Sequence, residues 1–139
     1  MKKKTNTGNA DKKKTRDFYR EQGYQSEYVE HLQSIFIPGR MIYKKTDLFA
    51  SDGVSINGKE IIFWNSKGRT AKDKGTLGSS LRKFDEHPFP DFVIREVVCW
   101  EPRKKTPYRL RTQNGRIWSI DCDNNEREYE YRNINLVEK

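Results

Sequence analysis

Residues 46–67 read TDLFASDGVSINGKEIIFWNSK, and they decide the fold that we expect for the chain. Asp52 opens a short run in which apolar residues alternate with small ones. Asn57-Gly58 follows, the dipeptide that most readily takes the positive φ angles of a two-residue hairpin turn. The next run, 60–64, is too short for a helix and rich in β-branched and aromatic residues. The stretch therefore predicts a strand, a tight turn and a second strand.

The second strand of this predicted hairpin leads into Asn65-Ser66-Lys67. Side chains two residues apart on a strand point to the same face, so Asn65 and Lys67 share one. Asp52, at the start of the partner strand, comes near them once the hairpin closes. A carboxylate, a second oxygen ligand and a lysine at one end of a hairpin can hold a divalent metal and a phosphate.

This arrangement resembles the PD-(D/E)XK nuclease superfamily, whose signature is an Asp that opens a strand, a hairpin, and an apolar strand ending in acid-x-Lys. The wider stretch, about residues 8–100, is similar to a phage and archaeal branch that includes Holliday-junction-resolvase-like proteins. The segments that carry this second similarity are Gly23-Tyr24, Val29-Glu30 and 45–49, KTDLF. The chain departs from the superfamily in having Asn65 where an acid stands, and Asn offers a metal a neutral carbonyl oxygen without charge.

The resemblance implies an α/β fold of restriction-endonuclease type, with a mixed central sheet flanked by helices. It implies Mg²⁺- or Mn²⁺-dependent hydrolysis of DNA phosphodiesters, with branched DNA such as a Holliday junction as one substrate. Asp52, Asn65 and the backbone carbonyl of Ser66 are then the metal ligands. Lys67 orients or helps to deprotonate the attacking water and neutralises the scissile phosphate. Symmetric cutting of a junction requires a homodimer.

A further acid is expected in the metal site, since many members of the superfamily carry one in their first helix. Here Lys12 to Lys14 occupy much of that region, and helix phase favours neither Asp11 nor Asp17 strongly. Glu30 is our first choice for the displaced acid, and a solvated surface Glu is the competing interpretation. Asp47 is the other candidate, as a direct ligand or as a neighbour of the ligands.

The composition favours a polyanionic partner, chiefly DNA. The 139 residues include 28 Lys and Arg against 20 Asp and Glu, for a net charge of +8. We expect a flexible basic arm over residues 1–7 and a single domain over 8–139, with a core at about 8–100 and a β extension over 101–139. The basic residues expected to contact DNA are Lys44, Lys45, Arg69, Lys72, Lys74, Arg82, Lys83 and Arg103.

Local signals predict the remaining elements. We expect helices over 10–22, capped by Asn9 and stopped by Gly23, and over 81–86, capped by Ser79 or Ser80. Strands are expected over 24–31 and 92–100, a hairpin over 108–120, and a tail that adds an edge strand or mediates a homodimer. Residues 35–37 are a short strand or a buried loop before a turn at Pro38-Gly39. Trp100 is either part of the core or, with the basic residues after it, a surface for a base.

Several classes of function and location are disfavoured. No apolar run approaches the ~20 residues that span a bilayer, and the basic N-terminus lacks the apolar region of a secretory signal. Two cysteines are too few for a disulfide scaffold, and His31, His87, Cys99 and Cys122 lack zinc spacing. We therefore expect an intracellular protein of a virus or its archaeal or bacterial host.

Two alternatives to the nuclease stay open. One is a DNA-binding protein on the same fold that has lost catalysis, which Asn65 and the basic first helix favour. The other is an RNA-binding or nucleoprotein-assembly module that uses the basic arm and the aromatic residues.

Overall fold

The structure is a computed structural model that describes residues 7–29, 31–37, 40–46, 49–68 and 74–139. Its elements in chain order are α1 (Thr7–Glu21), β1 (Gln25–Tyr28), β2 (His31–Ile37), β3 (Arg40–Thr46), β4 (Gly53–Ile56), β5 (Ile61–Lys67), α2 (Lys74–Phe84), β6 (Ile94–Cys99), β7 (Tyr108–Gln113), β8 (Arg116–Ile120), β9 (Glu126–Arg132) and β10 (Asn135–Glu138).

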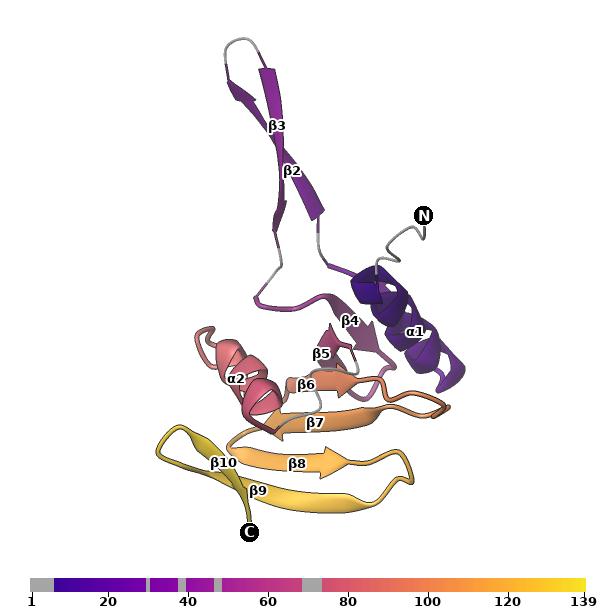
Figure 1. The fold of residues 1–139 in the computed structure, drawn as a ribbon, viewed down its shortest axis with the longest axis vertical. Coiled ribbons are helices and arrows are strands. Elements are labelled where there is room, and N and C mark those ends of the chain that lie inside the picture. Colours follow the sequence, from indigo (N-terminus) through magenta and orange to yellow (C-terminus); the bar gives the residue numbers. More distant parts are fainter. Residues whose placement is uncertain (1–6, 30, 38–39, 47–48, 69–73) are drawn as a thin grey trace, which may run out of the picture.

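Eight of these strands form one mixed sheet in the order β1-β4-β5-β6-β7-β8-β9-β10 (Figure 1). All neighbouring pairs are antiparallel except β5 and β6, which run parallel and are joined through α2. Parallel neighbours need a crossover, and a helix usually supplies it. The expectation of an α/β fold with a mixed sheet is therefore confirmed. Neither helix among the described residues is long and apolar enough to cross a membrane.

The hairpin that decides the fold is present as β4 and β5, but its turn is one residue later than predicted. The backbone N–H of Asn57 bonds to the carbonyl of Glu60, so Gly58 and Lys59 are the central residues, with Gly58 at φ +85°. The side chain of Asn57 accepts hydrogen bonds from the N–H groups of Lys59 and Glu60. Asn57 therefore closes the turn with its side chain, whereas the prediction gave it a positive φ angle.

The two helices cover opposite faces of the sheet. Along β6 the side chains alternate between a cluster with α1 and a cluster with α2. The α1 cluster contains Phe18, Tyr19, Ile62, Trp64, Ile94, Val98 and Trp100. The α2 cluster contains Leu77, Leu81, Phe84, Val97, Cys99, Leu110, Ile117 and Tyr129. Leu110, Ile117 and Tyr129 come from residues 101–139, so the predicted β extension shares this core.

The first helix begins earlier than predicted, because Asn9 lies inside α1 instead of capping it. Its end is as expected: Gly23 takes φ +92°, and its N–H bonds to the carbonyl of Arg20. The second helix also begins earlier, at Lys74, so Ser79 and Ser80 lie inside it and are not caps.

The other strands follow the predicted pattern with different limits. β1 is shorter than the predicted strand 24–31 and lies at one edge of the sheet. β6 is the predicted strand 92–100, and β7 and β8 form the predicted hairpin. The tail forms β9 and β10, with β10 at the other edge.

β2 and β3 pair only with each other, as a second two-stranded sheet that extends away from the main sheet in Figure 1. The strand alternative for residues 35–37 is confirmed, within the longer β2. Pro38-Gly39 and residues 1–6 of the predicted arm lie outside the described residues, and Thr7 already belongs to α1.

Candidate functional site

Three segments meet at the carboxyl end of β5: the first half of α1, the bend before β4, and residues 65–68. A carboxylate oxygen of Asp52 accepts a hydrogen bond of 2.8 Å from the N–H of Ser66. The hydroxyl groups of Thr15 and Ser66 lie 3.0 Å apart. The sequence prediction that the hairpin brings Asp52 beside Asn65-Ser66-Lys67 is thus matched by the fold.

Asp52 is a buried carboxylate, only 4% exposed. Its backbone is fixed on both sides, because its N–H bonds to the carbonyl of Trp64 at 2.8 Å and its own carbonyl accepts the N–H of Val29 at 3.1 Å. The Lys12 ammonium of α1 lies 3.8 Å from the other carboxylate oxygen. A buried charge is stable only with such partners, so Asp52 is held in place and partly neutralised.

Asn65 uses one end of its amide and leaves the other unused. Its Nδ2 donates a hydrogen bond of 3.1 Å to the carbonyl of Ala50. Because a carbonyl only accepts, the NH₂ end of the amide must face Ala50. The buried Oδ1 then has no hydrogen-bond partner among the described residues. An unpaired buried oxygen is uncommon and calls for a donor or a cation.

The amide of Asn65 also supports an unusual turn. Phe49 and Ala50 both have positive φ angles, 52° and 62°, a backbone conformation that residues other than Gly rarely adopt. Such strained conformations persist when the surroundings hold them, and they are found at functional sites. A carboxylate at position 65 has no hydrogen to donate to Ala50. The structure therefore gives a physical reason for Asn where the resemblance expects an acid.

Asp11 lies next to the end of β5. The sequence alone does not favour this residue over Asp17. Its Oδ2 is 3.1 Å from the position that a Cβ on Gly68 would occupy. Asp11, Thr15, Phe18 and Tyr19 follow the i, i+4, i+7, i+8 spacing of one helix face. Thr15 is fully buried despite its hydroxyl, which also accepts a hydrogen bond from Trp100 Nε1 at 2.8 Å. Counting Thr15 as an inward-facing residue would have placed Asp11 on the inner face.

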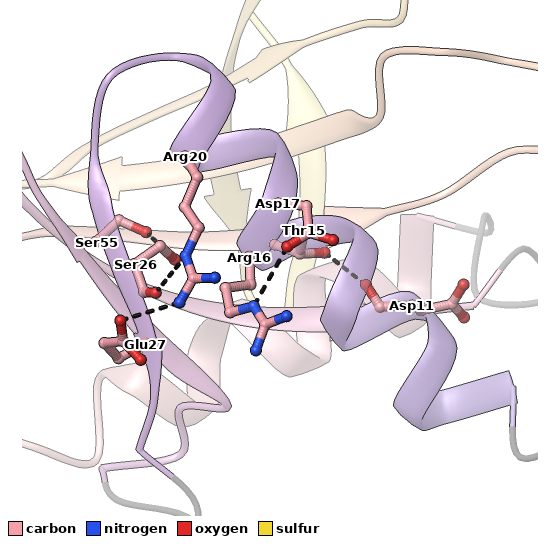
Figure 2. A network of polar contacts seen from close by, with 8 residues as sticks. All are labelled: Asp11, Thr15, Arg16, Asp17, Arg20, Ser26, Glu27 and Ser55. Atoms are coloured by element: carbon pink, nitrogen blue, oxygen red, sulfur yellow. Dashed lines mark hydrogen bonds and ion pairs between the residues drawn. The ribbon is translucent and has the colours of Figure 1, made fainter.

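Polar contacts fix α1 over the sheet (Figure 2). Arg20 donates to the carbonyl of Ser26 at 3.2 Å and to Glu27 at 3.0 Å, which ties the end of the helix to β1. Thr15 Oγ1 donates to the carbonyl of Asp11 within the helix.

The last turn of α1 is also tied to the sheet by Tyr19, which donates to Glu96, a fully buried carboxylate that also accepts from Arg111. Burial, with the nearby Glu96 charge, raises the pKa of Tyr19 well above its usual value. Thr15, Tyr19 and Arg20 therefore fix α1 against the sheet beside the site.

Lys67 and Ser66 complete the set of predicted residues that the structure brings together. Lys67 is half-buried, and by strand alternation it shares the face of Asn65. Its carbonyl accepts the N–H of Trp100 at 3.3 Å, so the ends of β5 and β6 meet here.

The remaining predicted residues either belong to other segments or lie outside the described residues. Glu30, Asp47, Arg69 and Lys72 lie outside the described residues. Lys44 and Lys45 belong to β3, outside the main sheet, and Lys74 is the first residue of α2. Arg82 and Lys83 lie in the last turn of α2, and Arg103 follows β6 with φ +64°.

The donor set suits a hard cation that keeps water in its shell. Over the part of the chain that the structure describes, no three His, Cys, Asp or Glu side chains gather to hold a metal ion. Mg²⁺ nevertheless prefers oxygen and is usually held by one or two carboxylates. The Asp52 carboxylate and the unpaired Oδ1 of Asn65 are oxygens of this kind. Alternation along β5, however, puts Asn65 on the α2 face, whereas Ser66 faces Thr15 of α1.

Comparisons of the whole chain with profiles of known protein families, with curated proteins and with solved structures gave no match.

Proposed function

We propose that this chain is a metal-dependent endonuclease that hydrolyses DNA phosphodiesters on a restriction-endonuclease-like fold. The observation that carries the proposal is the contact of Asp52 with Ser66, which sets a buried carboxylate beside Asn65 and Lys67 at one end of the hairpin. The net charge of +8 supports a polyanionic substrate.

The order of the elements supports the same proposal. The resemblance implies a first helix with an acid, an Asp that opens a strand, an apolar strand ending in x-Lys, and then a basic helix packed on the sheet. The chain has α1 with Asp11, then Asp52 before β4, then β5 ending in Lys67, then α2 with Arg82 and Lys83 in its last turn. Asp11 thus replaces Glu30 as our proposal for the missing acid, because it lies beside Gly68.

In this proposal Asp52, Asp11 and the carbonyl of Ser66 would hold Mg²⁺ or Mn²⁺ directly, and Asn65 Oδ1, on the other face of β5, would act through a water of the metal. When bound, the metal polarises the phosphate and stabilises the charge that develops on it. The Lys67 ammonium donates to the attacking water or to an oxygen of the scissile phosphate. The water oxygen bonds to phosphorus and gives up one proton to solvent, the P–O bond to one sugar breaks, and the departing oxygen takes up a proton from solvent. Cutting both strands of a junction requires two copies of the chain.

The test is cleavage of labelled four-way junction, flap and duplex DNA with Mg²⁺, with Mn²⁺ and with chelator. We expect metal-dependent cutting that Asp52→Asn and Lys67→Ala abolish, while DNA binding persists. Lys59→Ala is the matched control, since Lys59 is exposed at the hairpin turn. Cutting that Lys67→Ala retains would remove Lys67 from the mechanism.

A second candidate is a DNA-binding protein on the same fold without catalysis. It is favoured by Lys12, which places a positive charge 3.8 Å from the Asp52 carboxylate, and by the engagement of the Asn65 amide with Ala50. Salt-dependent DNA binding without cutting under any metal, and without a metal-dependent rise in melting temperature, would select this candidate.

A further inference from the structure

A hollow of about 310 Å³ lies between α1 and the segment that follows β6. Phe18 and Trp100 contribute its aromatic part, with ring centroids 6.2 Å apart. Lys14, Lys104 and Lys105 also line it, so cationic side chains surround an apolar base.

The hollow adjoins the candidate site through Trp100. The backbone N–H of Trp100 bonds to the carbonyl of Lys67, and its indole N–H bonds to Thr15, whose hydroxyl contacts Ser66. Because β5 and β6 are parallel, with Lys67 opposite Cys99, their carboxyl ends lie at the same edge of the sheet. In open α/β sheets this edge is where ligands bind. The hollow therefore lies at the same edge of the sheet as Lys67, next to the candidate site.

The charges around the hollow suit a phosphate group. Lys104 and Lys105 are exposed, and the Lys14 ammonium lies 5.8 Å from the centre of the Trp100 ring. Lysine recognises phosphate as a point charge on a flexible stem. Phe18 and Trp100 are each only 8% exposed, so ring edges rather than whole ring faces line the hollow and give a sugar its apolar contact.

Two acidic residues also line the hollow and limit its positive potential. The Asp17 carboxylate is paired with Arg16 at 3.3 Å, so its charge is largely compensated. Glu21 is exposed at the end of α1. The three lysines therefore outweigh the acids, and Glu21 is the group that most opposes an anion.

We propose that this hollow binds a backbone phosphate, with its sugar, of the DNA strand next to the phosphodiester that is cut. The inference rests on the proposed function, because it takes its substrate from that site. It assigns Lys14, Lys104 and Lys105 to one phosphate contact region.

The test measures binding of fluorescein-labelled DNA by anisotropy, in chelator so that nothing is cut, over a series of NaCl concentrations. The double variant Lys104→Gln/Lys105→Gln is compared with Lys59→Gln/Lys139→Gln, which removes two exposed lysines elsewhere. Each phosphate contact adds about 0.7 to 0.9 to the slope of log affinity against log salt. Because the hollow is proposed to hold one phosphate, we expect the first pair to lower that slope by about 0.7 to 0.9 and the control pair to leave it unchanged. Equal slopes in the two variants would overturn the proposal.

A second variant removes a negative charge at the hollow and keeps all its lysines, so it tests whether DNA binding responds to the local charge with the expected sign. Glu21→Gln is expected to strengthen DNA binding about two- to threefold at low salt, because it removes an opposing charge at the hollow. Glu86→Gln, another exposed acid, is the control and leaves the affinity unchanged. Weaker binding in Glu21→Gln would contradict the assignment.

A third arm separates a DNA strand from a small anion. Inorganic phosphate is added at fixed ionic strength, with chloride as the balance. Displacement of DNA by millimolar phosphate from the wild type, but not from the Lys104→Gln/Lys105→Gln variant, would show a site for free phosphate and overturn the proposal. The cleavage assay is separate, so a lowered salt slope without cutting removes the nuclease and keeps the contact region.

Discussion

The side-chain amide of Asn65 donates a hydrogen bond of 3.1 Å to the backbone carbonyl of Ala50, a residue with φ +62°. This contact joins the candidate site to a turn whose conformation few side chains tolerate. It also turns the Asn65 carbonyl away from Ala50, where it has no hydrogen-bond partner among the described residues. One amide therefore holds the turn and leaves a buried oxygen, which in our proposal would serve a cation.

Asn65→Asp separates these two roles. The variant loses the donor to Ala50 and brings a carboxylate toward a carbonyl, so we expect it to lose about 1–3 kcal/mol of stability without metal. The variant also adds a negative charge to the oxygen atoms proposed for the metal site, so it should bind Mg²⁺ more tightly. Mg²⁺ should therefore raise the melting temperature of the variant more than that of the wild type. Urea unfolding in chelator and thermal melts with Mg²⁺ measure the two effects. Unchanged stability in chelator would show that the contact with Ala50 does not hold the turn.

Lys12→Gln tests whether a lysine of α1 competes with a metal for Asp52. The Lys12 ammonium and the Asp52 carboxylate are 3.8 Å apart, with side chains 18% and 6% exposed. Removing the positive charge should tighten Mg²⁺ binding about three- to tenfold, or about 0.6–1.4 kcal/mol. Calorimetric titration with Mg²⁺ measures the change. Lys13→Gln, at the neighbouring exposed position, should bind Mg²⁺ as the wild type does.

Substitutions of the two aspartates of α1, Asp11 and Asp17, are expected to give different outcomes. Asp11 lies beside Gly68 at the end of β5, whereas Asp17 is paired with Arg16 further along the helix. We expect Asp11→Asn to lower the cleavage rate on the order of 100-fold, as loss of charge at a catalytic metal site does. Asp17→Asn should change the rate less than about twofold. Single-turnover cleavage rates with saturating DNA compare them, and similar losses in both variants would dismiss the special position of Asp11.

Local signals in the sequence predict the hairpin of β4 and β5, with Asp52 at its start. The limits of the helices, and the acid that the first helix contributes, depend instead on packing. The alternation before Asn57 and the apolar run before Asn65 give β4 and β5 without any knowledge of the rest. The start of α2 was missed because its glycines suggest a loop. In the structure Tyr131 donates to the carbonyl of Gly78, and Leu136 packs on the same residue. This contact from the far end of the chain stabilises the helix despite weak propensity.

The sequence left the choice of the acid from α1 open for a related reason. A search for apolar residues on α1 finds Phe18 and Tyr19 but passes over Thr15, whose hydroxyl is buried among partners from β5 and from the end of β6. Sequence alone does not show that a polar residue faces inward, since that depends on Ser66 and Trp100. The phase of the helix, and with it Asp11, is therefore settled by tertiary contacts.

Alkaline pH should destabilise the fold through its tyrosines. Burial, together with the hydrogen bond to Glu60, raises the pKa of Tyr24 to about 12, and burial raises the pKa of Tyr131 to about 12. A raised folded-state pKa means that the unfolded chain loses its proton first. The stabilisation is therefore complete below pH 10 and is lost as the pH rises from 10 to 12. Urea unfolding at pH 8, 10 and 11 should show a falling free energy, with a shallower fall in Tyr24→Phe. A free energy that is constant over this range would contradict the expected linkage.

Substitution of Gly53 and of Gly78 by alanine compares a position with no room for a Cβ atom with one that has room. A Cβ on Gly53 would lie 2.0 Å from Cζ2 of Trp64, a fully buried ring, whereas a Cβ on Gly78 meets Leu136 at 3.4 Å, an ordinary contact. Gly53→Ala should therefore cost about 3 kcal/mol or more, since the indole cannot move without disturbing the α1 cluster. Gly78→Ala should be neutral or stabilising by up to about 1 kcal/mol, because alanine favours the helix interior. Chemical unfolding of both variants measures the difference, and equal losses would show that Trp64 does not pack over β4 as the structure places it.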